Sequence, residues 1–150
     1  MADRTSPASR CFGCGNANPH GLGMHFRFDE GRAVAEFIIQ RQFQGYPGRA
    51  HGGVVATMLD EAMSWAVYHA GAWSMTARMT VRFRRAVPLG VAITATGWIT
   101  RDRGRYLELR SELRDARGVL LAEADGLFVR VAGRAAKELR EQYEASLAEA

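Results

Sequence analysis

The sequence has few of the features that mark secreted or membrane-spanning proteins. Its two cysteines, Cys11 and Cys14, are too few and too close together for the disulfide framework of a secreted protein. Residues 54–70 form the most apolar segment, but two acidic residues interrupt it, whereas a membrane-spanning helix needs about 20 largely uncharged residues. Residues 1–10 lack the apolar run of a secretory signal. We therefore expect a cytoplasmic protein with no membrane partner.

Lysine is almost absent, because Lys137 is the single lysine among 20 basic residues. The net charge of +4 comes almost entirely from arginine. A basic surface favours anionic partners in general, so the charge alone does not choose between nucleic acid, acidic membranes and phosphate-bearing ligands. The arginines are not interleaved with aromatic residues, and no nucleic-acid motif is present. We expect no nucleic-acid partner.

The chain of 150 residues is 47% apolar and 24% charged, which fits one globular domain better than two small ones. At this length about 70% of the unfolded surface can be buried, so stability requires neither a disulfide nor a structural metal. We expect a loose tail over residues 1–10, one domain over residues 11–132 and a C-terminal helix or tail over residues 133–150.

The hydrophobic pattern predicts an α+β domain. A strand-like hairpin spans residues 22–39, and a helix apolar on nearly every face, hence buried, spans residues 52–70. Short turns containing glycine connect the segments that follow, which implies an antiparallel meander wrapped around the helix. The four further strands are predicted over residues 73–87, 91–100, 105–114 and 119–131.

Two adjacent carboxylates, Asp60 and Glu61, interrupt the apolar helix. They lie about 100° apart around the helix axis, so they cannot share one role. Asp60 belongs to a stripe of small and polar residues that includes Thr57 and Ser64, as expected beside a ligand channel. We therefore favour Asp60 as the functional acid. The alternative is that both acids pair with arginines.

The predicted helix begins with Gly52 and Gly53, directly after His51. The first turn of a helix has unpaired N–H groups, and glycine lets a ligand oxygen approach them, so an oxyanion hole is plausible here. The alternative is that the glycines only permit a tight turn or close packing. Gly53 lies seven residues before Asp60, about 10.5 Å along the axis. If both act on one carbonyl, a second copy of the helix must supply one of them, at a homodimer interface.

The element order and two segments resemble the hot-dog fold acyl-CoA thioesterases of the PaaI type, in the 4-hydroxybenzoyl-CoA thioesterase superfamily. The segments are HGGVVATMLDEAM, at residues 51–63, and MTARMTVRFRRAVPLG, at residues 75–90. The opening CFGCGNANPHGL resembles a subset of these proteins. The resemblance implies about six antiparallel strands in the order β-β-α-β-β-β-β around one central helix. It also implies hydrolysis of an acyl-CoA thioester by a homodimer, paired into a dimer of dimers, with no cofactor required.

Carried over by position, the resemblance implies that Asp60 is the catalytic carboxylate, acting as nucleophile or as general base for water. Thr76 matches a position at which related enzymes place a Ser or Thr that helps to hold water. Glu61 stays a second candidate, because other hot-dog branches use glutamate. A hydratase is disfavoured, because Trp65 stands where an Asp-x4-His pairing would need histidine.

The same resemblance implies that the Gly52 N–H, helped by Gly53, polarises the thioester carbonyl in the neighbouring subunit's site, with His51 shaping the start of the helix. One position departs from the pattern. Some relatives have Asn or Gln about six residues before the histidine, whereas this chain has Gly45 beside Gln44. This departure favours the alternative function, a non-catalytic hot-dog protein that binds acyl-CoA as a sensor or scaffold.

Two further groups have both a functional and a structural interpretation. Arg82, Arg84 and Arg85 are candidates for binding the phosphates of coenzyme A, since arginine's fork suits phosphate, and the alternative is a solvent-facing stripe. The aromatic residues near the helix end and nearby are expected in the core, or lining a pocket for an aromatic or medium-chain acyl group; they are Trp65, Tyr68, His69, Trp73 and Trp98.

Cys11 and Cys14 have the spacing of a zinc-binding pair, and His20 and His25 follow them. The stretch between Cys14 and His20 is only five residues, well short of a zinc-finger pattern. We therefore expect an ordered loop with small buried thiols and no metal.

Overall fold

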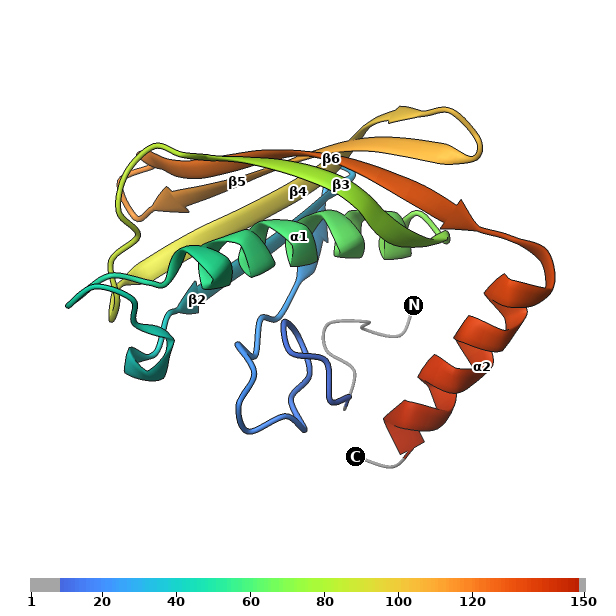
Figure 1. The fold of residues 1–150 in the computed structure, drawn as a ribbon, viewed down its shortest axis with the longest axis horizontal. Coiled ribbons are helices and arrows are strands. Elements are labelled where there is room, and N and C mark those ends of the chain that lie inside the picture. The colour runs from blue at the N-terminus through green and yellow to red at the C-terminus, as the bar shows by residue number, and fades with distance from the viewer. Residues whose placement is uncertain (1–8, 149–150) are drawn as a thin grey trace.

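The computed structural model describes residues 9–148, which form one curved antiparallel sheet around a long helix (Figure 1). The strand order in the sheet is β1-β2-β4-β5-β6-β3. The predicted α+β hot-dog architecture and its element order are confirmed. The strands are β1 (Arg27–Asp29), β2 (Arg32–Ile38), β3 (Trp73–Phe83), β4 (Ala92–Asp102), β5 (Tyr106–Asp115) and β6 (Leu120–Val131), and the helices are η1 (Arg41–Phe43, a 3-10 turn), α1 (Gly52–His69) and α2 (Gly133–Ala148).

Two strands are shorter than the sequence pattern predicts, because hydrogen bonds at their ends break the regular ladder. The predicted first strand loses its beginning, since the Met24 N–H donates to the carbonyl of Gly13 in the N-terminal loop at 2.9 Å. β3 ends at Phe83 instead of residue 87. The N–H groups of Arg84 and Arg85 both donate to the Leu121 carbonyl at 2.9 Å, so the chain bends away from β6 there.

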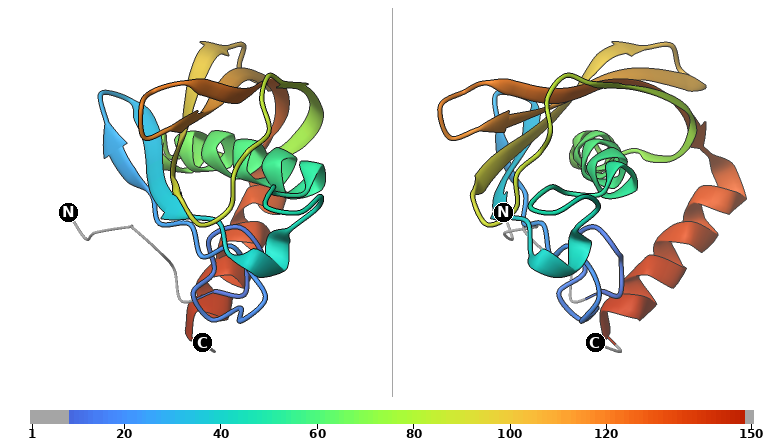
Figure 2. Two further views of the ribbon diagram at one scale, coloured as in Figure 1. Left: turned by 90° about the vertical axis from the view of Figure 1, so that its left-hand side faces the viewer. Right: turned by 60° about the vertical axis from the view of Figure 1, so that its left-hand side comes forward.

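α1 lies in the hollow of the sheet, and Figure 2 shows it nearly end-on beneath the strands. Met58, Leu59 and Met63 on its sheet-facing side are fully buried, and each contributes about 1.5–3 kcal/mol. β4 approaches the helix so closely that a Cβ at Gly97 would lie 2.2 Å from the Ala62 carbonyl oxygen. The prediction that the helix is buried nearly all round is wrong for one side, where Asp60 is only half-buried.

β3 lies at one of the two edges of the sheet and, within residues 9–148, pairs with β6 alone. A β-bulge interrupts this pairing between Thr76 and Arg78. The side chains of Met75 and Phe83 are 54% and 58% exposed. This edge therefore offers unpaired backbone and apolar side chains in the single chain.

The predicted C-terminal helix forms α2, which extends from the end of β6 toward the loop of residues 9–24 (Figure 1). Its Tyr143 ring packs on Trp73 and Tyr68 with centroid distances of 5.4 and 5.9 Å. Neither α1 nor α2 has the length and apolar character needed to cross a membrane. Most of the expected tail, residues 1–8, lies outside the described residues.

Candidate active site

The first turn of α1 is capped by the histidine that precedes it. The N–H of Gly53 donates to Nδ1 of His51 at 3.0 Å, and the N–H of Val55 donates to the His51 carbonyl at 3.0 Å. The bond to the His51 ring occupies the Gly53 N–H, which was expected to help polarise a substrate carbonyl. The Gly52 N–H has no acceptor within residues 9–148, and Gly52 is exposed. Of the two glycine N–H groups, only that of Gly52 is therefore open to a ligand.

The packing of the loop before α1 favours glycine at position 45, where the family resemblance led us to look for Asn or Gln. A Cβ at this position would lie 3.0 Å from Cα of His51, so a side chain there would push against the cap. The neighbouring Gln44 is used locally, because its Oε1 accepts the Gly48 N–H at 2.9 Å. No polar side chain occupies the place where some relatives have Asn or Gln.

Asp60 and Thr76 come together across the space between α1 and β3. Oγ1 of Thr76 donates to Oδ1 of Asp60 at 2.7 Å. Burial raises the pKa of the Asp60 carboxyl above its usual range, and the Thr76 hydrogen bond partly opposes that rise. Oδ2 of Asp60 has no hydrogen bond within the described part of the chain, so it is available to a ligand or water. The bulge after Thr76 is a feature that the sequence pattern does not reveal.

Glu61 faces a different side of α1, about 100° around the axis from Asp60, toward the N-terminal loop. Its Oε1 accepts the Trp65 indole N–H at 3.1 Å and lies 3.7 Å from Sγ of Cys11. Burial, together with the nearby Cys11 sulfur, raises the pKa of the Glu61 carboxyl to about 7. The two adjacent acids therefore have separate surroundings, as their spacing on the helix predicts.

A cavity of about 380 Å³ lies between α1, the start of β3, α2 and the N-terminal loop. It reaches Ser64, which is one helical turn after Asp60 on the same side of α1. Its walls are mainly apolar and aromatic. Of the aromatic residues predicted near a pocket, Trp65, Tyr68 and Trp73 line it, whereas His69 and Trp98 do not. Its lining includes Cys11, Cys14, Glu61, Trp65, Tyr68, Trp73, Met75, Leu139 and Tyr143.

Two of the three arginines proposed for phosphate binding already have acidic partners. Arg82 pairs with Asp125 at 2.5 Å, and Arg84 pairs with Glu123 at 2.5 Å. Arg85 makes no ion pair within residues 9–148 and lines a cavity of about 280 Å³ together with Gly52. Among the three, Arg85 is best placed for an anion near the start of α1.

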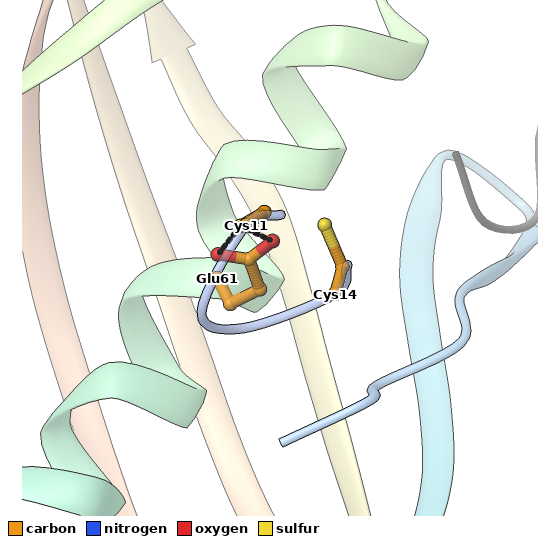
Figure 3. Close-up of side chains that lie close together, drawn as sticks. All are labelled: Cys11, Cys14 and Glu61. Atoms are coloured by element: carbon orange, nitrogen blue, oxygen red, sulfur yellow. Dashed lines mark hydrogen bonds between the residues drawn. The ribbon is translucent and has the colours of Figure 1, made fainter. Parts of the chain in front are cut away.

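Of the four residues considered for zinc, the structure brings together only the cysteines. Cys11, Cys14 and Glu61 place one potential ligand atom each within 4.8 Å of one another (Figure 3). His20 and His25 are exposed and are not part of this cluster. Sequence reasoning missed Glu61 as a member because 50 residues separate it from Cys11 and only the packing of the loop on α1 joins them.

Comparisons with known proteins show the family to which the chain belongs. Residues 47–122, just over half of the chain, match the thioesterase superfamily. The chain is 34% identical over 116 residues to acyl-coenzyme A thioesterase THEM4 of Bos taurus, covering 74% of this chain and 48% of that protein. It is 31% identical over 122 residues to the THEM4 protein of Xenopus laevis, covering 77% and 54% respectively. The chain spans about half the length of these relatives.

Two solved structures share the fold. A thioesterase superfamily protein superposes with a TM-score of 0.74 at 30% identity, covering 77% of this chain and 60% of that one. The Escherichia coli PaaI protein from the phenylacetic acid degradation operon gives a TM-score of 0.70 at 24% identity, covering 75% and 82%. The fold likeness therefore extends over about three quarters of the chain.

Proposed function

The chain belongs to the thioesterase superfamily, and on that premise we propose that it hydrolyses the thioester of an acyl-coenzyme A to a free acid and coenzyme A. The observation that carries the proposal is the Asp60 carboxylate, held by Thr76 at 2.7 Å on a half-buried side of α1. The two THEM4 relatives are named as acyl-coenzyme A thioesterases, which supports the substrate class.

The proposed reaction needs one carboxylate and one oxyanion donor. Asp60 takes a proton from water, whose oxygen bonds to the thioester carbon, or it attacks that carbon itself and is later released by water. The carbonyl oxygen becomes an oxyanion, which the Gly52 N–H at the positive end of α1 stabilises. Collapse of the adduct breaks the C–S bond, and coenzyme A leaves as a thiolate that takes up the proton.

The acyl group is the part of the substrate for which the 380 Å³ cavity is suited. The cavity begins one helical turn beyond Asp60, and Trp65, Tyr68, Trp73 and Tyr143 form part of its wall. We propose an apolar acyl group, aromatic or of medium chain length. The nucleotide part would lie toward the start of α1, where Arg85 has no acidic partner among the described residues.

The active site is proposed to form between two copies of the chain. The axial separation of Gly52 and Asp60 supports this, because eight residues of α1 span about 12 Å. The exposed edge of β3 carries Thr76 and the apolar Met75, so a second copy could cover it. A single chain would then hold two incomplete sites.

The proposal is tested by measuring thiol release from short, medium, long and aromatic acyl-CoAs. We expect turnover of at least one substrate by the wild type and its loss in Asp60→Asn, with folding intact. Asp29→Asn is the matched control, because Asp29 is exposed at the end of β1. Loss of turnover in Glu61→Gln, with retention in Asp60→Asn, would show that the other carboxylate acts.

A second candidate function is acyl-CoA binding without hydrolysis. It is favoured by Gly45, which carries no polar side chain and where a Cβ would lie 3.0 Å from Cα of His51. Calorimetric binding of acyl-CoA with no thiol release from any substrate would support this function and overturn hydrolysis.

A further inference from the structure

The loop of residues 9–24 presents two thiols to a carboxylate on α1 (Figure 3). Sγ of Cys11 lies 3.7 and 3.9 Å from the two Glu61 oxygens, and one ligand atom from each of Cys11, Cys14 and Glu61 fits within 4.8 Å. Ligand atoms of a tetrahedral zinc site lie about 3.6–3.8 Å apart, given Zn–S bonds of about 2.3 Å and Zn–O bonds of about 2.1 Å. Only small movements would bring this cluster to that geometry.

The backbone of the loop is arranged around the Cys11 sulfur. Gly15 N–H donates to the Cys11 carbonyl at 2.9 Å, which closes a tight turn over the two cysteines. The turn brings the sulfurs of Cys11 and Cys14 and one oxygen of Glu61 within 4.8 Å of one another.

Gly13 lets the loop lie directly on the carboxylate. A Cβ at this position would be 2.5 Å from Cδ of Glu61, which is closer than atoms can approach. The Met24 N–H donates to the Gly13 carbonyl at 2.9 Å and holds the loop in this place. Gly13 therefore packs directly against the Glu61 side chain, and the Met24 hydrogen bond holds the loop backbone beside it.

We propose that Cys11, Cys14 and Glu61 bind one divalent zinc ion. Two thiolates with one carboxylate form a donor set that suits zinc better than magnesium or calcium, which prefer oxygen ligands. All three residues also line the 380 Å³ cavity proposed for the acyl group, so a water at the fourth position of the ion would lie at the wall of that cavity. Binding releases the protons still carried by the three ligands to solvent. This site is separate from the Asp60–Thr76 pair.

The sequence predicts no metal because His20 and His25, the candidate ligands after the cysteines, do not have the spacing of a zinc finger. In the structure the third candidate ligand is instead Glu61, which is distant from the loop in sequence. The same residues have two alternative states, a metal-free hydrogen-bonded cluster and a Cys11–Cys14 disulfide. A cobalt titration and a mass measurement distinguish both states from a zinc site.

The test titrates the reduced, metal-free protein with Co²⁺ and then with Zn²⁺. We expect one equivalent of Co²⁺ per chain, visible d–d bands of a tetrahedral site, a thiolate-to-cobalt charge-transfer band and displacement of all three signals by Zn²⁺. Cys11→Ser, Cys14→Ser and Glu61→Gln should each weaken binding at least about tenfold. The matched controls His20→Gln and His25→Gln should bind like the wild type.

Three results would overturn the zinc site. One is no cobalt spectrum from the reduced wild type, which would leave a hydrogen-bonded cluster. Another is a protein isolated with a Cys11–Cys14 disulfide, seen as a mass lower by two hydrogen atoms, that binds no metal even after reduction. The third is equal weakening in the histidine variants. Because Asp60→Asn should bind cobalt normally, failure of the proposed hydrolysis and failure of this site are distinguishable.

Discussion

Thr76 on the edge strand β3 donates its hydroxyl to Asp60 on α1 at 2.7 Å. The two residues are 16 positions apart, and the β-bulge that follows Thr76 changes the register of β3 at this point. The hydrogen bond engages Oδ1 of Asp60 and leaves Oδ2 available to a substrate or a water molecule on this side of the helix. Thr76 is therefore a positioning residue for the proposed catalytic carboxylate.

Thr76→Val should lower kcat with little change in KM. A hydrogen bond to a charged group contributes about 1.5–3 kcal/mol, so the loss of orientation should cost about 10–100-fold. Thr76→Ser keeps the hydroxyl and should retain most of the activity. Thr80→Val, on the same strand and exposed, is the control. Steady-state kinetics that show Thr76→Val equal to the control would remove Thr76 from the site.

Gly52→Pro should remove the oxyanion donor without breaking α1. Proline is favoured at the first position of a helix, and His51, with φ −62° and ψ 139°, already has the extended conformation required before proline. Loss of one such donor costs about 10²–10³-fold in kcat. Gly52→Ala retains the N–H and meets only Phe83 at 3.8 Å, so it should remain active. Circular dichroism checks that both variants keep the helix.

Two inactive variants should restore activity to each other when their subunits exchange. If Asp60 of one chain acts with the Gly52 N–H of another, a mixed dimer of Asp60→Asn and Gly52→Pro contains one intact site. Random pairing at equal amounts then gives about a quarter of wild-type activity. Light scattering would establish the dimer, and refolding the mixture from denaturant would ensure exchange. No recovery in a mixture proven to be dimeric would place both groups in one chain.

The architecture could be predicted from the sequence because its elements differ in hydrophobic period. The long apolar helix and the strands after it are marked by glycine-containing turns, and Asp60 stands out as a charge in an apolar helix. The predicted positions of the end of β3 and of the start of β1 were wrong. Hydrogen bonds from the Arg85 N–H to Leu121 and from the Met24 N–H to Gly13 set these two limits, and hydrophobic periodicity does not report such long-range bonds.

Within the site, the sequence indicated which residues to consider but not which hydrogen bonds they form. The two glycines at the start of α1 look equivalent, yet the His51 ring accepts one of their two N–H groups. Rotamer-dependent capping of this kind is a property of the folded loop. The contact between Glu61 and Cys11 depends on tertiary packing across 50 residues, for which a single sequence has no local signal.

Tyr143→Ala should shift the acyl preference toward longer or bulkier groups. Tyr143 on α2 lines the 380 Å³ cavity and packs edge-on against Trp73 at 5.4 Å, so its removal enlarges the space beyond Ser64. The expected result is a rise in kcat/KM for long-chain relative to short-chain acyl-CoA. One methylene in an apolar pocket changes discrimination by about 1–3 kcal/mol, so the ratio should move by at least about tenfold.

The control for that shift is Tyr46→Ala, because Tyr46 is 83% exposed in the loop before α1 and lies outside the cavity lining. Tyr143→Phe should keep the wild-type preference, since the ring rather than the hydroxyl fills the space. An equal loss for every chain length in Tyr143→Ala would mean that α2 only supports the fold. An unchanged ratio with full activity would place the acyl group elsewhere, because a residue in its path cannot lose a whole ring without altering which groups fit.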